Sequence, residues 1–295
     1  MTNQIRPYLW FDTQAREAAR FYVETFPASR ITNTTAINDT PSGDSEIVSF
    51  ELLGQDFMAI SAGPLFKFTP AVSFLVSCAT RDEVDQLWAR LAAGGQALMP
   101  LDSYPFSDRF GWTNDRYGLS WQVMLARAPE ISQRIAPALM FVGDSCGRAE
   151  EAVEMYTSIF PGSALGEVTR YGPGEEPDRE GTLKHCDFAL GGQRFAAMDS
   201  AGPHEFTFNE AVSFLVDCAD QTEIDRYWEA LSAFPEAEQC GWVKDRFGVS
   251  WQIVPAVMDS MMSNGSPEQI ARVTQAFLKM KKFDVADLQR AYAGA

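Results

Sequence analysis

Hydrophobic positions along the chain recur in two periods, and together they predict short strands alternating with amphipathic helices. The apolar run Pro7–Phe11 predicts a strand, and Asp12 or Thr13 is placed to cap the helix expected after it. That helix spans about residues 14–25, has apolar residues at helical spacing, and ends before Pro27. A buried face of this kind predicts a helix packed on a sheet.

The rest of the first 128 residues continues this pattern. The expected elements are a strand at Ile47–Leu52, a turn at Gly54-Gln55, a returning strand at Phe57–Ile60, a strand at Ala71–Val76, a helix at about Arg81–Ala93, and closing strands joined by a turn at Asp115–Gly118. The pattern therefore predicts a strand, a helix and three strands, twice over.

The same elements return in the second half of the chain. Gly111–Leu125 is matched by Gly241–Val254, Ala71–Val76 recurs letter for letter as Ala211–Val216, and Phe21–Pro27 is matched by Met155–Pro161. The copies differ by loop insertions, most clearly an extra segment around Gln96–Phe106 in the first copy. We therefore expect one domain at 1–128, a second at 129–256 and a helical tail at 257–295, in which Ser266 starts one helix and Asp284 caps another.

Composition limits the classes of function that the protein can have. Of 295 residues, 46% are hydrophobic and 22% charged, which predicts an ordinary globular protein, and the net charge of −16 argues against nucleic-acid binding. The five cysteines show no C-x-x-C spacing, so neither a disulfide framework nor a zinc ribbon is indicated. The N-terminus lacks an apolar signal core and no run is long enough to span a membrane, which predicts a cytoplasmic protein.

The last strand of each copy carries a glutamine on an otherwise weakly polar face. Leu119, Trp121 and Val123 point to one side of the strand, while Ser120, Gln122 and Met124 point to the other. The second copy repeats this arrangement around Gln252. A solvent-facing surface would carry charges, so the glutamine face is expected to be partly enclosed and to line a pocket; the alternative is that each glutamine only hydrogen-bonds backbone inside the sheet.

These repeated passages together resemble the PhnB-like branch of the vicinal oxygen chelate superfamily, some of whose members carry the label 3-demethylubiquinone 3-methyltransferase. That superfamily also includes glyoxalase I, bleomycin-resistance proteins and extradiol dioxygenases. The resemblance covers about residues 5–127 and 135–256. It implies an α+β fold of two tandem domains, each a pair of βαβββ modules, whose mixed sheets curl into cups with helices on the outer face. It also implies an internal pseudo-dimer, which could pair further as a homodimer.

In metal-dependent relatives the glutamine position holds a metal-binding carboxylate, with a His on the first strand of a module and a Glu on the fourth. The corresponding positions here are Pro7, Pro137, Ser73 and Ser213 on first strands, and Ala59 or Ser61 and Ala197 or Asp199 on fourth strands. These do not make a set of three His, Asp, Glu or Cys ligands, so we expect neither a metal nor a cofactor.

Other chemistries lack their motifs. The sequence has no G-x-G-x-x-G, no P-loop and no G-x-S-x-G, and it lacks the glycine-rich strand-to-helix turn that methyltransferases of the common fold use. We expect Asp115-Arg116 and Asp245-Arg246 to be turns with an ion pair at their base. His185, within a strand, is expected to be structural.

We therefore expect a metal-free protein that binds a small organic molecule in two cups, the first lined by Leu9, Phe11, Ser73 and Gln122 and the second by Leu139, Phe141, Ser213 and Gln252. The other candidate ligand-binding residues are Ser61, Trp112, Asp199, His204 and Trp242. One alternative is a glyoxalase- or dioxygenase-like enzyme with an unconventional metal site around Asp199, His204 and Gln252. Another is a partner-binding scaffold that uses the acidic surface and the C-terminal helices.

Overall fold

A computed structural model describes residues 5–40, 43–126 and 133–294, so the expected domain boundary at 128–129 lies outside the described residues. The strands are β1 (Ile5–Phe11), β2 (Arg30–Thr40), β3 (Gly43–Leu52), β4 (Gln55–Ser61), β5 (Val72–Cys78), β6 (Gln96–Tyr104), β7 (Ser107–Asn114), β8 (Ser120–Leu125), β9 (Ile135–Phe141), β10 (Ala164–Arg170), β11 (Leu183–Leu190), β12 (Gln193–Asp199), β13 (Val212–Cys218), β14 (Trp242–Lys244) and β15 (Ser250–Pro255). The helices are α1 (Ala15–Thr25), α2 (Arg81–Leu91), α3 (Ala149–Ile159), α4 (Gln221–Leu231), α5 (Val257–Asn264), α6 (Pro267–Phe277) and α7 (Val285–Ala293). None of these helices combines the length and the apolar composition that a membrane span needs.

The strands form two curved mixed sheets, and each sheet draws on both repeats. The seven-stranded sheet has the order β14-β15-β13-β1-β4-β3-β2, and the eight-stranded sheet has the order β10-β11-β12-β9-β5-β8-β7-β6. The joins between repeats are antiparallel, β1 with β13 and β5 with β9. The α+β prediction with cup-like sheets is confirmed. The expected membership of the cups is wrong, because Ser73 lies in the sheet of Leu139 and Ser213 in the sheet of Leu9.

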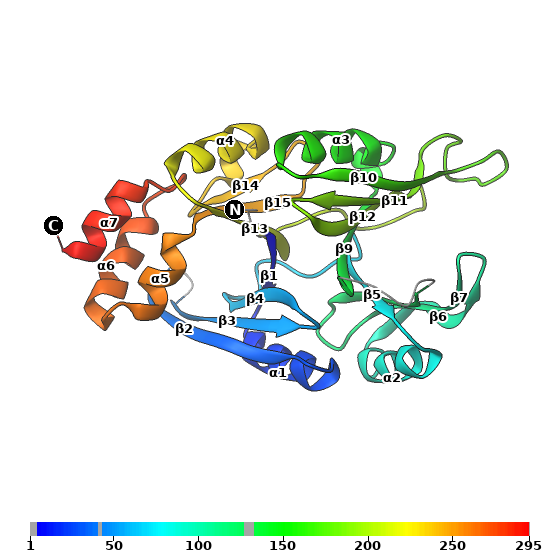
Figure 1. Ribbon diagram of the computed structural model, residues 1–295, viewed down its shortest axis with the longest axis horizontal. Coiled ribbons are helices and arrows are strands. Elements are labelled where there is room, and N and C mark those ends of the chain that lie inside the picture. The colour runs from blue at the N-terminus through cyan, green and yellow to red at the C-terminus, as the bar shows by residue number, and fades with distance from the viewer. Residues whose placement is uncertain (1–4, 41–42, 127–132, 295) are drawn as a thin grey trace.

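Four helices cover the outer faces of the sheets. Helices α1 and α2 lie along one side of the molecule and α3 and α4 along the other, with the strands between them (Figure 1). One continuous buried cluster joins these helices to the sheets, and its largest fully buried side chains include Trp121, Trp251, Tyr22 and Tyr156. The inner faces of the sheets are free of these four helices and are the surfaces on which a site can be built.

The fourth module departs from the predicted order. After α4 the chain forms a 3-10 turn at Pro235–Ala237 and then only two strands, β14 and β15, where the first repeat has β6, β7 and β8. The extra segment of the first copy is strand β6, which gives the eight-stranded sheet its additional edge. The prediction of three strands after every helix is therefore wrong for this module.

The repeated turn holds a buried carboxylate rather than an ion pair. Asp115 is 3% exposed and accepts hydrogen bonds from the Tyr22 hydroxyl, the Trp121 indole N–H and two backbone amides. Asp245 makes the matching bonds with Tyr156 and Trp251. The predicted ion pair is therefore wrong, although Gly118 has the positive φ (+88°) that the turn prediction required.

Candidate functional site

Alternation along the strands separates the two faces of each sheet. In β5 the side chains of Val72, Phe74 and Val76 belong to the core beneath the helices. Those of Ser73 and Leu75 point to the opposite, concave face. We call the concave face of the eight-stranded sheet the eight-stranded cup, and that of the other sheet the seven-stranded cup.

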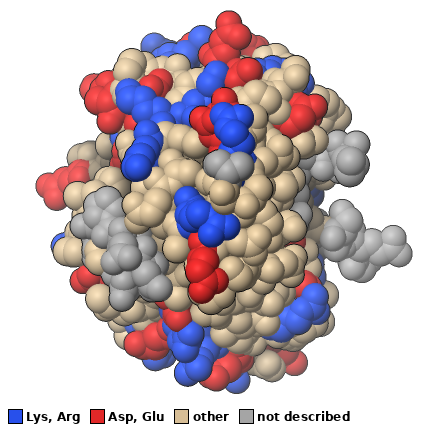
Figure 2. Space-filling model, turned by 90° about the vertical axis from the view of Figure 1, so that its left-hand side faces the viewer, with Lys and Arg blue, Asp and Glu red and all other residues tan. Residues whose placement is uncertain are grey.

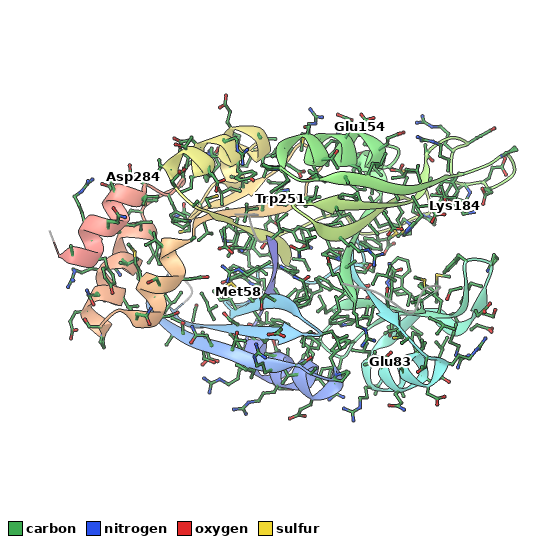
Figure 3. All side chains as sticks on the ribbon, viewed as in Figure 1. Met58, Glu83, Glu154, Lys184, Trp251 and Asp284 are labelled. Atoms are coloured by element: carbon green, nitrogen blue, oxygen red, sulfur yellow. The ribbon has the colours of Figure 1, made fainter. Side chains whose placement is uncertain are left out.

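The floors of the two cups differ in side-chain volume. Across the eight-stranded cup, aligned residues run Ser120, Ser73, Ala138, Ala196 and Asp187. The equivalent row of the seven-stranded cup runs Ser250, Ser213, Tyr8, Met58 and Ser49. Alanines thus occupy the centre of one floor where the other floor has a tyrosine and a methionine, and Met58 points into the space between the two arms of its sheet (Figure 3).

One wall of the eight-stranded cup carries buried polar side chains. The Gln122 amide N–H donates to the Ser73 hydroxyl at 2.8 Å, and the Trp112 indole N–H donates to the Ser120 hydroxyl at 2.8 Å. Gln122 is buried and Trp112 is partly exposed. This wall therefore offers hydrogen-bonding groups that are already oriented by a neighbour.

The opposite wall carries charges that the sequence analysis did not identify. Asp187 lies 3.6 Å from the His185 imidazole and 3.6 Å from the Arg194 guanidinium, and all three side chains are partly exposed. A hydrogen bond from His185 is the main cause that lowers the pKa of Asp187. The signal was available, because His185 and Asp187 are two residues apart in one strand and must share a face.

The seven-stranded cup is filled by the chain itself. Helices α5, α6 and α7, which we call the C-terminal helices, lie across the end of the molecule at which the two arms of this sheet open (Figure 1). A second buried cluster joins the cup to them: Tyr8, Met58, Leu215 and Val254 from the strands, and Met258, Met261, Val273, Phe283 and Leu288 from the C-terminal part. Figure 2 looks onto this end of the molecule, where Lys, Arg, Asp and Glu side chains are interspersed among uncharged residues. Helix α5 was not predicted, whereas the starts of α6 at Ser266 and α7 at Asp284 are confirmed.

An ion-pair cluster ties α5 to the floor of this cup. The Arg6 guanidinium contacts the Asp217 carboxylate at 2.6 Å and the Asp259 carboxylate at 2.9 Å. Burial raises the pKa of Asp217 to about 6, and the positive charge of Arg6 opposes this shift. In the eight-stranded cup, the position of Arg6 is taken by Ala136.

The raised pKa makes stability depend on pH between about 4 and 6. Because the folded protein holds the Asp217 proton more tightly than the unfolded chain, the contribution is complete below pH 4 and is lost as the pH rises through 6. We expect it to be about 3 kcal/mol. Urea unfolding at several pH values should therefore show a smaller loss of stability between pH 4 and 6 for Asp217→Asn than for the unaltered protein; identical slopes would contradict the assignment.

The sheet places several predicted site residues on the helix side. Leu9, Phe11, Leu139 and Phe141 belong to the core beneath the helices. The concave positions of β1 are instead those of Arg6, Tyr8 and Trp10, because one residue of offset exchanges the two faces of a strand. Trp242 is on the concave side, where its ring meets Tyr8 and Trp10 edge-on.

Ser61 and Asp199 support the starts of helices. The Ser61 hydroxyl accepts from the Ala15 amide at 3.1 Å, and the Asp199 carboxylate accepts from the amides of Gly147 and Ala149. Neither Asp12 nor Thr13 caps α1, contrary to expectation, because the residue at that position is Gln14.

The suggested metal grouping is not assembled. Asp199 lies in the eight-stranded sheet on the helix side, whereas Gln252 lies in the other sheet and donates to Ser213 at 2.9 Å. His204 instead pairs with Ser200 at 2.8 Å. Within residues 5–40, 43–126 and 133–294, no group of three or more His, Cys, Asp or Glu side chains is placed to hold a metal ion.

A half-open cavity of about 320 Å³ lies at the carboxyl end of β1. Its lining includes Trp10, Phe11, Asp12, Phe66 and Tyr117. Of the predicted site residues, Phe11 is the one that reaches it. The cavity has an aromatic wall and a volume at the lower end of the range for small-molecule sites.

Comparison with known proteins gives a consistent family assignment. Residues 3–124 and 133–254 each match the family model described as 3-demethylubiquinone-9 3-methyltransferase. The PhnB protein from Bacillus cereus is 41% identical over 41% of this chain and 98% of its own, with a TM-score of 0.39. Glyoxalase I from Zea mays is 11% identical over 86% of this chain and 94% of its own, with a TM-score of 0.55, which shows a shared fold. The comparison with curated proteins finds no match.

Proposed function

Because the chain belongs to the family described as 3-demethylubiquinone-9 3-methyltransferase and carries its unit twice, we propose that it binds a small organic molecule, without a metal ion, in the eight-stranded cup. The other cup is occupied by the C-terminal helices.

The observation that supports this proposal is the difference between the two cups in the size of their equivalent floor residues. Ala138 and Ala196 stand where the filled cup has Tyr8 and Met58. The alanines are 2% and 1% exposed. A ligand that displaces the atoms covering them would find a narrow apolar floor beneath it.

The two walls define how such a ligand is held. Gln122 and Trp112 supply neutral hydrogen-bonding groups on one side, while Asp187 and Arg194 supply charges on the other. An apolar body between polar walls is typical of small-molecule sites, in which a few polar groups fix the orientation. The chain lacks the glycine-rich turn that common-fold methyltransferases use, so the proposal is one of binding and does not include methyl transfer.

Replacing Ala138 with tyrosine is expected to abolish binding while leaving the fold intact. The equivalent residue of the other cup is already Tyr8, so the backbone at this position accommodates the larger side chain. Ligands first identified with the unaltered protein by ligand-observed NMR across a fragment library should lose at least tenfold in affinity, which corresponds to about 1.4 kcal/mol.

The matched control is Tyr8→Phe, a change of one hydroxyl in the filled cup, which should leave the affinity of every fragment unchanged. Circular dichroism checks that both variants remain folded. Fragments that bind Ala138→Tyr as tightly as the unaltered protein would place the site outside the eight-stranded cup and refute the proposal.

A further inference from the structure

The C-terminal helices occupy a cup in which some buried polar atoms have no hydrogen-bond partner. Within residues 5–40, 43–126 and 133–294, four buried side-chain polar atoms lack a hydrogen-bond partner: Arg6 Nε, Ser250 Oγ, Thr274 Oγ1 and Asn114 Oδ1. Three of them belong to the seven-stranded cup or to the helices that fill it. Each such atom costs about 1–3 kcal/mol, which offsets part of what the apolar contacts contribute.

The other repeat shows what a satisfied arrangement looks like. In the eight-stranded cup, Trp112 donates to the Ser120 hydroxyl. In the filled cup the equivalent Ser250 is 1% exposed and has no partner, while Trp242 turns its ring toward Tyr8 and Trp10. The Ser250 hydroxyl of the filled cup therefore has no hydrogen-bond partner, whereas the equivalent Ser120 hydroxyl of the eight-stranded cup has one.

The C-terminal helices can also leave without disturbing any strand pairing. They follow β15, the last strand, and their backbone bonds to the sheet region are those from Cys240 to Met280 and from Gly241 to Lys281, at 2.9 and 2.8 Å. The other polar contacts are made by side chains. The Gln221 side chain of α4 bonds the backbone of Phe283 and Val285, Lys281 pairs with Glu238, and Lys282 pairs with Asp225. At the rim Asn33 bonds Ser263, and Arg6 pairs with Asp259, whose carboxylate side chain is 53% exposed. Such a segment can open as one unit at a lower free energy than global unfolding.

The chemistry of the segment defines what could replace it. It presents apolar side chains, among them Met261 and Phe283, to the apolar part of the cup, and one carboxylate, that of Asp259, to Arg6. When the segment leaves, Arg6 keeps Asp217 and loses its second anionic partner. A molecule with an apolar body and one carboxylate would restore both sets of contacts.

We propose that the C-terminal helices are a displaceable occupant of the seven-stranded cup, and that an apolar organic acid binds there in their place with its carboxylate at Arg6. The seven-stranded cup is then a second site, distinct in its ligand from the eight-stranded cup, and access to it depends on the pair of Arg6 with Asp259.

Hydrogen–deuterium exchange of the full-length protein, titrated with decanoate, tests this directly. Decanoate should speed exchange of the amides of residues 257–293 by at least tenfold, while α1 to α4 stay protected. 1-Decanol, which has the same chain length and no carboxylate, should have less than a tenth of this effect at equal concentration. Asp259→Asn weakens the pair that holds α5, so it should lower the decanoate concentration needed for half of the effect by about tenfold.

Two further variants test the role of Arg6 and provide a control. Arg6→Met should remove the difference between decanoate and decanol, and Asp287→Asn, on the exposed surface of α7, should behave as the unaltered protein. Should Arg6→Met fail to fold, the comparison of the two probes on Asp259→Asn serves instead. Unchanged exchange of 257–293 in decanoate, an equal response to decanol, or acceleration spread over α1 to α4 would each overturn the proposal. Ala138→Tyr should respond to decanoate normally, so this proposal and that for the eight-stranded cup can fail separately.

Discussion

Replacing Asp115 or Asp245 with alanine is expected to destabilise the protein by about 4 kcal/mol. Each carboxylate accepts four hydrogen bonds in a buried turn, from a tyrosine hydroxyl, a tryptophan indole and two backbone amides. Alanine leaves all four donors without an acceptor, and each donor that is buried costs about 1–3 kcal/mol. Urea unfolding followed by tryptophan fluorescence measures the change.

The control for this loss is Asp108→Ala, an exposed aspartate on β7, for which a change below about 0.5 kcal/mol is expected. The asparagine variants should fall between, since an amide keeps one acceptor oxygen for the backbone amides but turns its N–H group toward the indole donor. A loss below about 1 kcal/mol for both alanine variants would show that the two turns do not anchor the repeats.

Dividing the chain into residues 1–128 and 129–295 is expected to leave neither part as a folded monomer. Each sheet is completed across the repeats, by five aligned residue pairs between β1 and β13 and five between β5 and β9. An isolated repeat would expose two unpaired strand edges, which favour association. Size-exclusion chromatography with light scattering should find self-associated or aggregated material for each part alone and a one-to-one complex when both are produced together.

A folded monomer of a single repeat would contradict this expectation. A stable monomer of 1–128 with native-like circular dichroism would mean that a single repeat forms a complete sheet by itself. The shared sheets would then not be needed for folding, and the pseudo-dimer would be only two neighbouring domains.

The sequence predicts element types well where one face of an element is apolar and the other is not. Strand β8 alternates cleanly, so its two faces were assigned correctly, with Trp121 in the core and Gln122 on the concave side. Strand β1 carries large apolar or aromatic residues on both faces from Pro7 to Phe11, and its faces were exchanged for that reason: Leu9 packs beneath the helices, whereas Tyr8 enters the cup.

The packing and pairing of elements that are far apart in the sequence cannot be predicted from the hydrophobic pattern of single elements. Periodicity predicts an amphipathic helix after Ser266 but not which surface it covers, and strand signals do not specify that β1 pairs with β13 rather than with β5. The difference between the two floors could have been found in the sequence, because aligning Ile5–Phe11 with Ile135–Phe141 sets Tyr8 against Ala138. The volume difference stands out only once that face is known to line a cup.

Duplication of the fold gives the protein two cups whose side chains can differ. One cup has a large-residue floor, an arginine and a cover made of the chain's own helices; the other has small residues and polar walls. The differences lie in side chains on one face and in the presence of β6, while the core residues of both repeats remain nearly the same. Core residues that match between the repeats while the concave faces differ are what is expected if the scaffold is maintained and the sites diverge.

A crystal structure of the full-length protein soaked with a library of small organic fragments tests the central claim most directly. The account predicts fragment density in the eight-stranded cup, over Ala138 and Ala196 and within hydrogen-bonding distance of Gln122 or Trp112. Fragments bound only in the aromatic cavity at the end of β1, or a metal ion coordinated by Gln122 in place of any fragment, would contradict it.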